Sequence, residues 1–115
     1  MGIMDFDEYQ KRAAETDLAT AGHDQTYARM YLCMGLAGEA GEVVEKVKHI
    51  IRDKSGVVSD EAKEHLKKEI GDVLWYASQI AQSFGVSFGE AAQHNLDKLA
   101  DRAQRGVLHG NGDTR

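Results

Sequence analysis

The apolar residues of this chain recur with a helical period in almost every segment. Between positions 27 and 51, 66 and 84, and 92 and 103, apolar side chains return every three or four residues, which is the spacing of one face of an α-helix. Proline, which breaks helix interiors, is absent from the sequence. The pattern predicts an all-α protein with helices at about residues 5–21, 24–53, 59–84 and 87–104.

Local signals mark where these helices begin and end. Asp5 with Glu8, and Ser87 with Glu90, have the spacing of a capping box at a helix start. Glycine commonly ends a helix, and Gly22 and Gly85 stand where the first and third predicted helices stop. The glycine-rich residues 106–115 are expected to be irregular, and disordered without ligand. We predict one four-helix, bundle-like domain at residues 1–105, followed by a tail at 106–115.

The length of the second predicted helix bears on assembly. A helix over residues 24–53 is about 45 Å long, whereas the radius of gyration of a compact domain of this size is about 13 Å. Gly35, Gly38 and Gly41 each cost about 1 kcal/mol relative to alanine in a helix interior. They suggest close approach of another backbone or of a ligand, or else a break near Gly35 or Gly38. Either way we expect a homodimer or homotetramer.

Composition excludes several classes of protein. With 115 residues and a net charge of −5, the chain lacks the basic footprint of a nucleic-acid backbone binder. It has no apolar run of about 18 residues that would span a membrane, and its first residues lack the apolar core of a signal peptide. The single cysteine, Cys33, forms no intrachain disulfide and is expected to be a small core residue. We therefore expect a cytoplasmic protein.

Two acidic pairs are the strongest candidates for chemistry. Glu39 and Glu42 are spaced i, i+3, and so are Glu69 and Asp72, which places each pair about 5–6 Å apart on one helix face. A single pair of this kind is usually a solvated surface pair. Two pairs, both within apolar and glycine-rich helices, indicate a site with only oxygen ligands for Mg²⁺ or Mn²⁺.

Other polar residues suggest a ligand with phosphates. Tyr76 shares a helix face with the second acidic pair, and Asn95, Lys98 and Arg102 share a face of the fourth predicted helix. An aromatic ring, a metal site and a cationic face together suggest a nucleotide, although each alone is commonly structural. A separate basic stretch is either a solvated helix face or a binding site for small polyanions; it consists of Lys46, Lys48, His49, Arg52 and Lys54.

Taken together, these motifs resemble the MazG-like family of all-α nucleoside triphosphate pyrophosphohydrolases. The family hallmark is Glu-Glu-x-x-Glu followed by Glu-x-x-Asp. The stretch from Gly38 to Glu42 matches its last two glutamates, with Gly38 where the first often stands, and the stretch from Glu69 to Asp72 matches the second half. The resemblance covers most of the chain, from Phe6 to the tail.

The resemblance implies a reaction and a site. Nucleoside triphosphates, ribo- or deoxyribo-, would be cut between the α and β phosphates to monophosphate and pyrophosphate, a house-cleaning role for the nucleotide pool. It implies Mg²⁺ ligands at Glu39, Glu42, Glu69 and Asp72, and contacts to base, sugar and phosphates from Tyr76, Asn95, Lys98 and Arg102. It also implies an active site at a dimer interface. From the length of the second predicted helix and its glycines, we expect the first helix and the tail to reach the site of a second copy, with Gln10 or Arg115 contacting substrate. The general base is left open among the four acids and Glu45.

Two other classes of function were weighed. A di-metal redox bundle normally carries Glu-x-x-His on facing helices, and no histidine follows three residues after the glutamates considered as ligands. A non-enzymatic helical interaction module, with its acidic pairs only at the surface, is the second alternative. The preferred base and sugar, and whether damaged nucleotides are the target, are not indicated by the sequence.

Overall fold

The computed structural model describes residues 4–115, and in this part of the chain all regular secondary structure is α-helical. The helices are α1 (Phe6–Ala14), α2 (Gln25–Lys54), α3 (Asp60–Ser83) and α4 (Phe88–Gln104). The all-α prediction is therefore confirmed, and α2, α3 and α4 begin and end within one residue of their predicted bounds. None of the described helices combines the length and the apolar character needed to cross a membrane.

The first helix is shorter than predicted. It ends at Ala14 instead of continuing to residue 21, and irregular chain follows. Short polar side chains explain the difference, because they bond to nearby groups in place of helix formation. The Thr16 hydroxyl donates to the carbonyl of Ala13 (2.7 Å), and Asp17 accepts from both the backbone N–H (3.2 Å) and the hydroxyl of Thr20.

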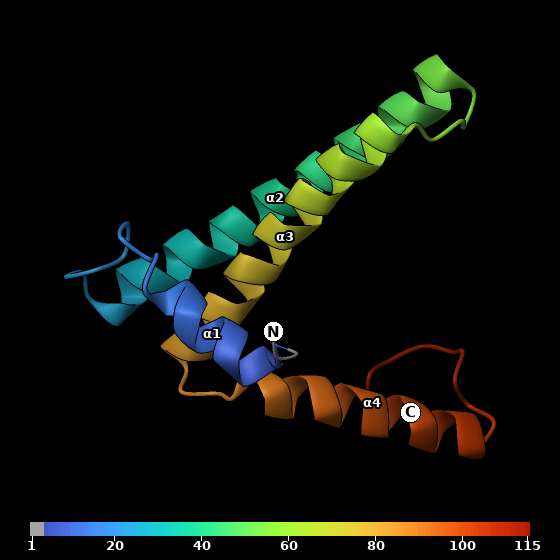
Figure 1. Ribbon diagram of the computed structural model, residues 1–115. Helices are drawn as coiled ribbons and strands as arrows, with labels where there is room; N and C mark the ends of the chain where they lie inside the picture. The colour runs from blue at the N-terminus through green and yellow to red at the C-terminus, as the bar shows by residue number, and fades with distance from the viewer. Residues whose placement is uncertain (1–3) are drawn as a thin grey trace.

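Helices α2 and α3 form a long antiparallel hairpin, and α1 lies against the second half of α3 (Figure 1). Helix α4 leaves the end of α3 in a different direction and contacts α1 and α3; within residues 4–115 it has no contact with α2. The four helices therefore do not close into a bundle within one chain. Helix α2 is continuous through its three glycines, so the predicted alternative of a break is wrong.

A polar junction holds α1, α3 and the start of α4 together. Gln10 is 7% exposed, and its amide donates to the carbonyl of Val86 (2.8 Å) while its oxygen accepts from the N–H of Phe88 (3.0 Å). The amide of Gln79 donates to the backbone carbonyl of Gln10 (3.3 Å). Because Gln10 is committed to this junction, the prediction that it contacts substrate in a second copy finds no support in its position.

The chain exposes far more surface than a compact monomer. Its accessible area is 8445 Å² and its radius of gyration 17.0 Å, whereas a folded monomer of this mass exposes about 6,200 Å². Among residues 4–115, only Ala13 and Leu32 are buried hydrophobic residues. The apolar faces of α2, α3 and α4 are largely uncovered, as in Tyr27, Met30, Met34, Val44, Ile51, Ile70 and Leu96.

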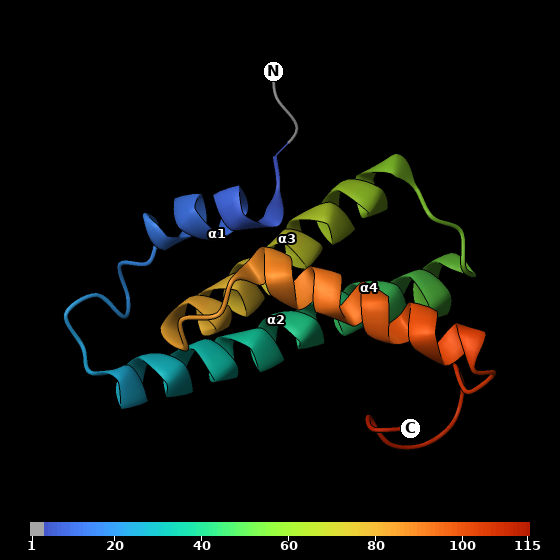
Figure 2. The same ribbon diagram turned by 90° about the horizontal axis from the view of Figure 1, so that it is seen from below.

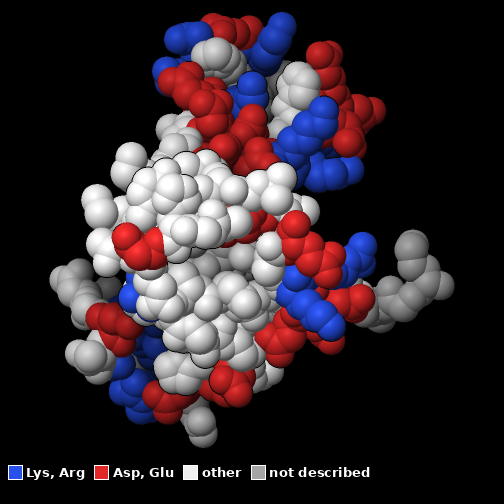
Figure 3. Space-filling view, turned by 90° about the vertical axis from the view of Figure 1, so that its left-hand side faces the viewer, with Lys and Arg blue, Asp and Glu red and all other residues white. Residues whose placement is uncertain are grey.

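Figure 3 shows one consequence, a broad area almost free of charged side chains. The upper end of that view, which is the tip of the α2–α3 hairpin, carries charges of both signs instead. Cys33 belongs to the exposed part of α2. Its prediction as a core residue is wrong, because no other helix within residues 4–115 covers that side of α2.

Candidate functional site

Three carboxylates meet where α2 and α3 face each other. Glu39 comes from α2, and Glu69 and Asp72 come from α3. Each offers one oxygen, and these oxygens all lie within 4.8 Å of one another. The i, i+3 spacing places Glu69 and Asp72 on one face of α3, and hairpin packing turns that face toward Glu39. A donor set made only of carboxylate oxygens fits a hard divalent cation such as Mg²⁺ or Mn²⁺.

The electrostatics of this cluster favour a cation. Among the described residues, none of the three carboxylates has a lysine or arginine within ion-pair distance. The pKa of Glu39 is raised above its ordinary value, first by partial burial and then by the negative charges of Asp72, Glu69 and Glu42. A bound divalent ion would relieve that repulsion.

The fourth predicted ligand lies just outside this group. Glu42 is exposed one turn further along α2, and it acts on Glu39 through its charge without joining the three clustered oxygens. Glu45, considered as a general base, accepts from Lys48 (2.9 Å) and lies 3.3 Å from the His49 ring nitrogen. The hydrogen bond from Lys48 lowers the pKa of Glu45, which makes it a weaker base.

Aromatic side chains form the other side of the cluster. A shallow cavity of about 320 Å³ is lined by Glu39, Asp72, Trp75 and Tyr76. The two rings meet edge to face, with centroids 5.0 Å apart, and the Trp75 indole N–H donates to the Thr16 hydroxyl (2.8 Å). Tyr76 thus lies where the sequence placed it. Trp75 was not predicted, although its position three residues after Asp72 puts it on the same helix face.

Tyr76 reaches this position because of a glycine. A Cβ built on Gly35 would lie 2.1 Å from Cε1 of Tyr76, so only glycine leaves room for the ring. Burial raises the pKa of Tyr76, as do the neighbouring Tyr31 hydroxyl and the Glu39 and Asp72 carboxylates. The predicted close approach at Gly35 is therefore made by a side chain. At Gly38 and Gly41 a Cβ would meet no described atom within 4 Å.

The predicted contacts on α4 are not brought to the carboxylates within one chain. Asn95 is exposed, whereas Lys98 and Arg102 bind the tail residue Asp113 at 2.8 and 3.1 Å. Helix α4 and α2 make no contact between residues 4 and 115. Arg115 bonds to carbonyls of its own tail, so its predicted reach to the site of a second copy is not seen in the single chain.

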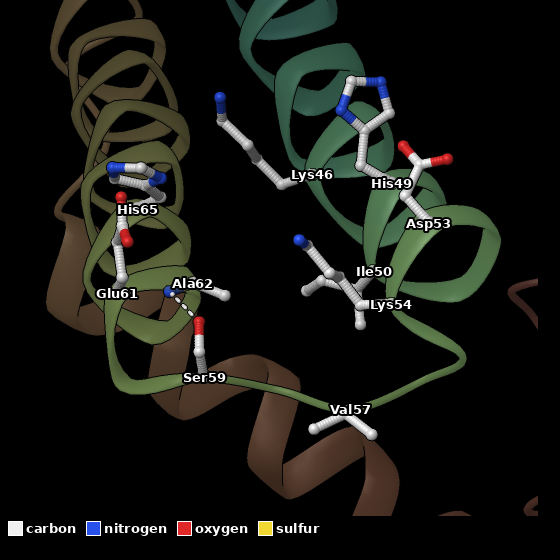
Figure 4. A pocket seen from close by; sticks show the side chains of 10 residues that line it. All are labelled: Lys46, His49, Ile50, Asp53, Lys54, Val57, Ser59, Glu61, Ala62 and His65. Carbon is white, nitrogen blue, oxygen red and sulfur yellow. Dashed lines mark hydrogen bonds between the residues drawn. The ribbon is translucent and has the colours of Figure 1, made fainter.

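A larger cavity, about 640 Å³, lies at the tip of the hairpin, away from the acidic cluster. In Figure 4 the amino groups of Lys46 and Lys54 point toward the gap between the helices. Lys48 and Arg52 are instead paired with Glu45 and Asp53, as a solvated helix face predicts. Of these two cavities, the smaller is the candidate site, because Glu39 and Asp72 of the clustered carboxylates line it.

Comparison with known proteins agrees with this geometry. The MazG nucleotide pyrophosphohydrolase domain model matches residues 26–107, which span both acidic pairs and all of α4. The gene 37 protein of Mycobacterium phage L5 is 43% identical over 114 residues, covering 97% of this chain and all of that protein. A comparison with solved structures gave no match. The chain belongs to the MazG family of nucleotide pyrophosphohydrolases.

Proposed function

We propose that this protein hydrolyses nucleoside or deoxynucleoside triphosphates at the α–β bond, with Mg²⁺, to monophosphate and pyrophosphate. The observation that carries the proposal is the group of three carboxylate oxygens within 4.8 Å of one another, beside an aromatic cavity. Membership of a nucleotide pyrophosphohydrolase family supplies the reaction class. Removal of unwanted nucleotides from the cellular pool is the role that we attach to it.

In this proposal the carboxylates hold the metal and the aromatics hold the base. Glu39, Glu69 and Asp72 are the principal ligands of Mg²⁺, and Glu42 is a fourth. Mn²⁺ would substitute for Mg²⁺ at the same site. When bound there, Mg²⁺ would neutralise phosphate oxygens, orient the attacking water and lower its pKa. Trp75 and Tyr76 border the cavity next to the ligands, so we assign to them the stacking on the base, with the phosphates facing the acids.

The phosphate and sugar contacts are assigned to a second copy of the chain. Asn95, Lys98 and Arg102 lie on α4, away from the acids of their own chain, and a homodimer or homotetramer would present them to a partner's carboxylates. Two features support assembly. The accessible area exceeds that of a compact monomer by about 2,200 Å², and apolar side chains of α2, α3 and α4 are uncovered.

A panel of nucleoside triphosphates, each assayed with Mg²⁺ for its primary products, tests the reaction. We expect monophosphate and pyrophosphate from one cut, and appearance of diphosphate with orthophosphate would refute the proposal. Glu69→Gln and Asp72→Asn should each abolish turnover with unchanged helix content. Glu64→Gln is the matched control, because Glu64 lies on the same helix and pairs with Lys67 in solvent. Near-normal turnover of either site variant at saturating Mg²⁺ would disprove the metal assignment.

A further inference from the structure

The C-terminal tail folds back on itself and along α4. Gly106, with φ of +74°, turns the chain after the helix ends, and the tail then returns beside α4 in both ribbon views (Figures 1 and 2). The Arg115 guanidinium donates to the carbonyls of Val107 (3.2 Å), Leu108 (2.8 Å) and Gly112. The tail is irregular, as predicted, but it is a closed loop with its own hydrogen bonds.

This loop places one carboxylate on two cations of α4. The Lys98 amino group donates to Asp113 Oδ1 (2.8 Å), and Arg102 Nη2 donates to the same oxygen (3.1 Å) and to the Asp113 carbonyl. Arg102 is only 4% exposed. Asp113 therefore occupies Arg102 Nη2, and an external anion would have to displace Asp113 to bind that group.

Asp113 is an incomplete match for the cations that it contacts. Within residues 4–115, Arg102 Nε is buried and has no hydrogen-bond partner, and a buried donor without a partner is unfavourable. Guanidinium groups bind oxyanions best through two parallel hydrogen bonds. A phosphate group has more acceptor oxygens than the single carboxylate oxygen seen here, so it is able to satisfy Nε and Nη2 together.

The tail is also held weakly enough to be exchanged. The Asp113 side chain is 79% exposed, so water screens its pairs with the less exposed Lys98 and Arg102. Beyond the cap of α4, the other tail hydrogen bonds run from Arg115 to tail carbonyls and from Arg105 to the Arg115 carbonyl (2.9 Å). Gly106 caps the end of α4: its φ is positive, and the N–H groups of Gly106 and Val107 donate to the carbonyls of Ala103 (3.2 Å) and Arg102 (2.9 Å). The part of the tail that would move with Asp113 therefore lies beyond Val107.

We propose that Lys98 and Arg102 form an oxyanion-binding site, that the Asp113 carboxylate occupies it in the free protein, and that a phosphate group of the nucleotide displaces Asp113. The tail is thus a built-in competitor of substrate. The identity of the displacing group as a nucleotide phosphate rests on the proposed function, whereas the oxyanion site itself does not.

Pyrophosphate binding without metal tests the site independently of catalysis. Isothermal titration in EDTA should give a Kd about fivefold lower for Asp113→Asn than for the natural sequence, since one competing ion-pair contact is lost. Asp97→Asn is the matched control: it removes the same charge from α4, where Asp97 accepts a hydrogen bond from Gln93 (2.9 Å) of the same helix, and it should leave Kd unchanged. Adding Arg102→Gln to Asp113→Asn should remove the gain.

In the hydrolysis assay, Asp113→Asn should lower KM by a similar factor and leave kcat unchanged. Pyrophosphate binding to Asp113→Asn that equals or falls below that of the natural protein would overturn the inference, even if triphosphates are hydrolysed as proposed. Tighter pyrophosphate binding in a protein that hydrolyses no triphosphate would support the oxyanion site and refute the proposed function instead.

Discussion

Replacing Gly35 with alanine adds one methyl group at the point where Tyr76 crosses α2. The new Cβ would lie 2.1, 2.4 and 2.6 Å from Cε1, Cζ and Cδ1 of the ring. Carbon atoms in contact are at least about 3.5 Å apart, so the ring must move by about 1.4 Å. Because Tyr76 borders the cavity beside Glu39 and Asp72, this movement changes the candidate base site directly.

Two opposing effects set the expected stability of Gly35→Ala. Alanine in place of a helical glycine stabilises by about 1 kcal/mol, and overpacking costs about 1–3 kcal/mol, so the net change is a loss of about 0–2 kcal/mol. Gly38→Ala and Gly41→Ala are matched controls on the same helix, because nothing lies within 4 Å of their added Cβ atoms. Each control should gain about 1 kcal/mol.

Equilibrium urea unfolding at one fixed protein concentration measures these differences, and steady-state kinetics measures KM. We expect Gly35→Ala to be at least about 1 kcal/mol less stable than Gly41→Ala and to have a raised KM. In a Tyr76→Ala background, Gly35→Ala should raise the stability relative to Tyr76→Ala alone, because the obstructing ring is then absent. If Gly35→Ala is as stabilising as Gly41→Ala, the packing of Tyr76 on Gly35 is refuted.

Three further outcomes are expected. Glu69→Gln and Asp72→Asn should leave the stability of the metal-free protein unchanged or higher in urea unfolding, because each removes a like charge from a repelling cluster; a clear loss would contradict that repulsion. The raised pKa of Glu39 means that the folded state holds its proton more tightly than the unfolded state. Without metal, the free energy of unfolding should therefore fall as pH rises from 4.5 through the raised value, and Glu39→Gln should flatten this pH dependence. Light scattering should show a dimer or tetramer at micromolar concentration, with specific activity falling on dilution as assembly is lost; a fully active monomer would rule out a shared site.

The positions of the helices could be predicted from local sequence because the residues that determine them lie within one helical turn of each helix end. Asp24, Ser59 and Ser87 each accept a hydrogen bond from an N–H three residues ahead, so the N-terminal boundaries of α2, α3 and α4 need no tertiary information. The end of α1 was missed because the bonds of Thr16 and Asp17 compete with a helix that the apolar pattern continues.

The spacing of the acidic pairs was likewise readable, since i, i+3 residues share a helix face whatever surrounds them. Which carboxylates meet across helices depends on how α2 packs on α3, and packing joined Glu39 to Glu69 and Asp72 while leaving Glu42 outside. The same holds for Asp113 on Arg102, a contact between a tail and a helix with no shared periodicity. Sequence determined the helices and their faces because those depend on neighbours in the chain; only tertiary structure decided the partners, because those depend on relative placement in space.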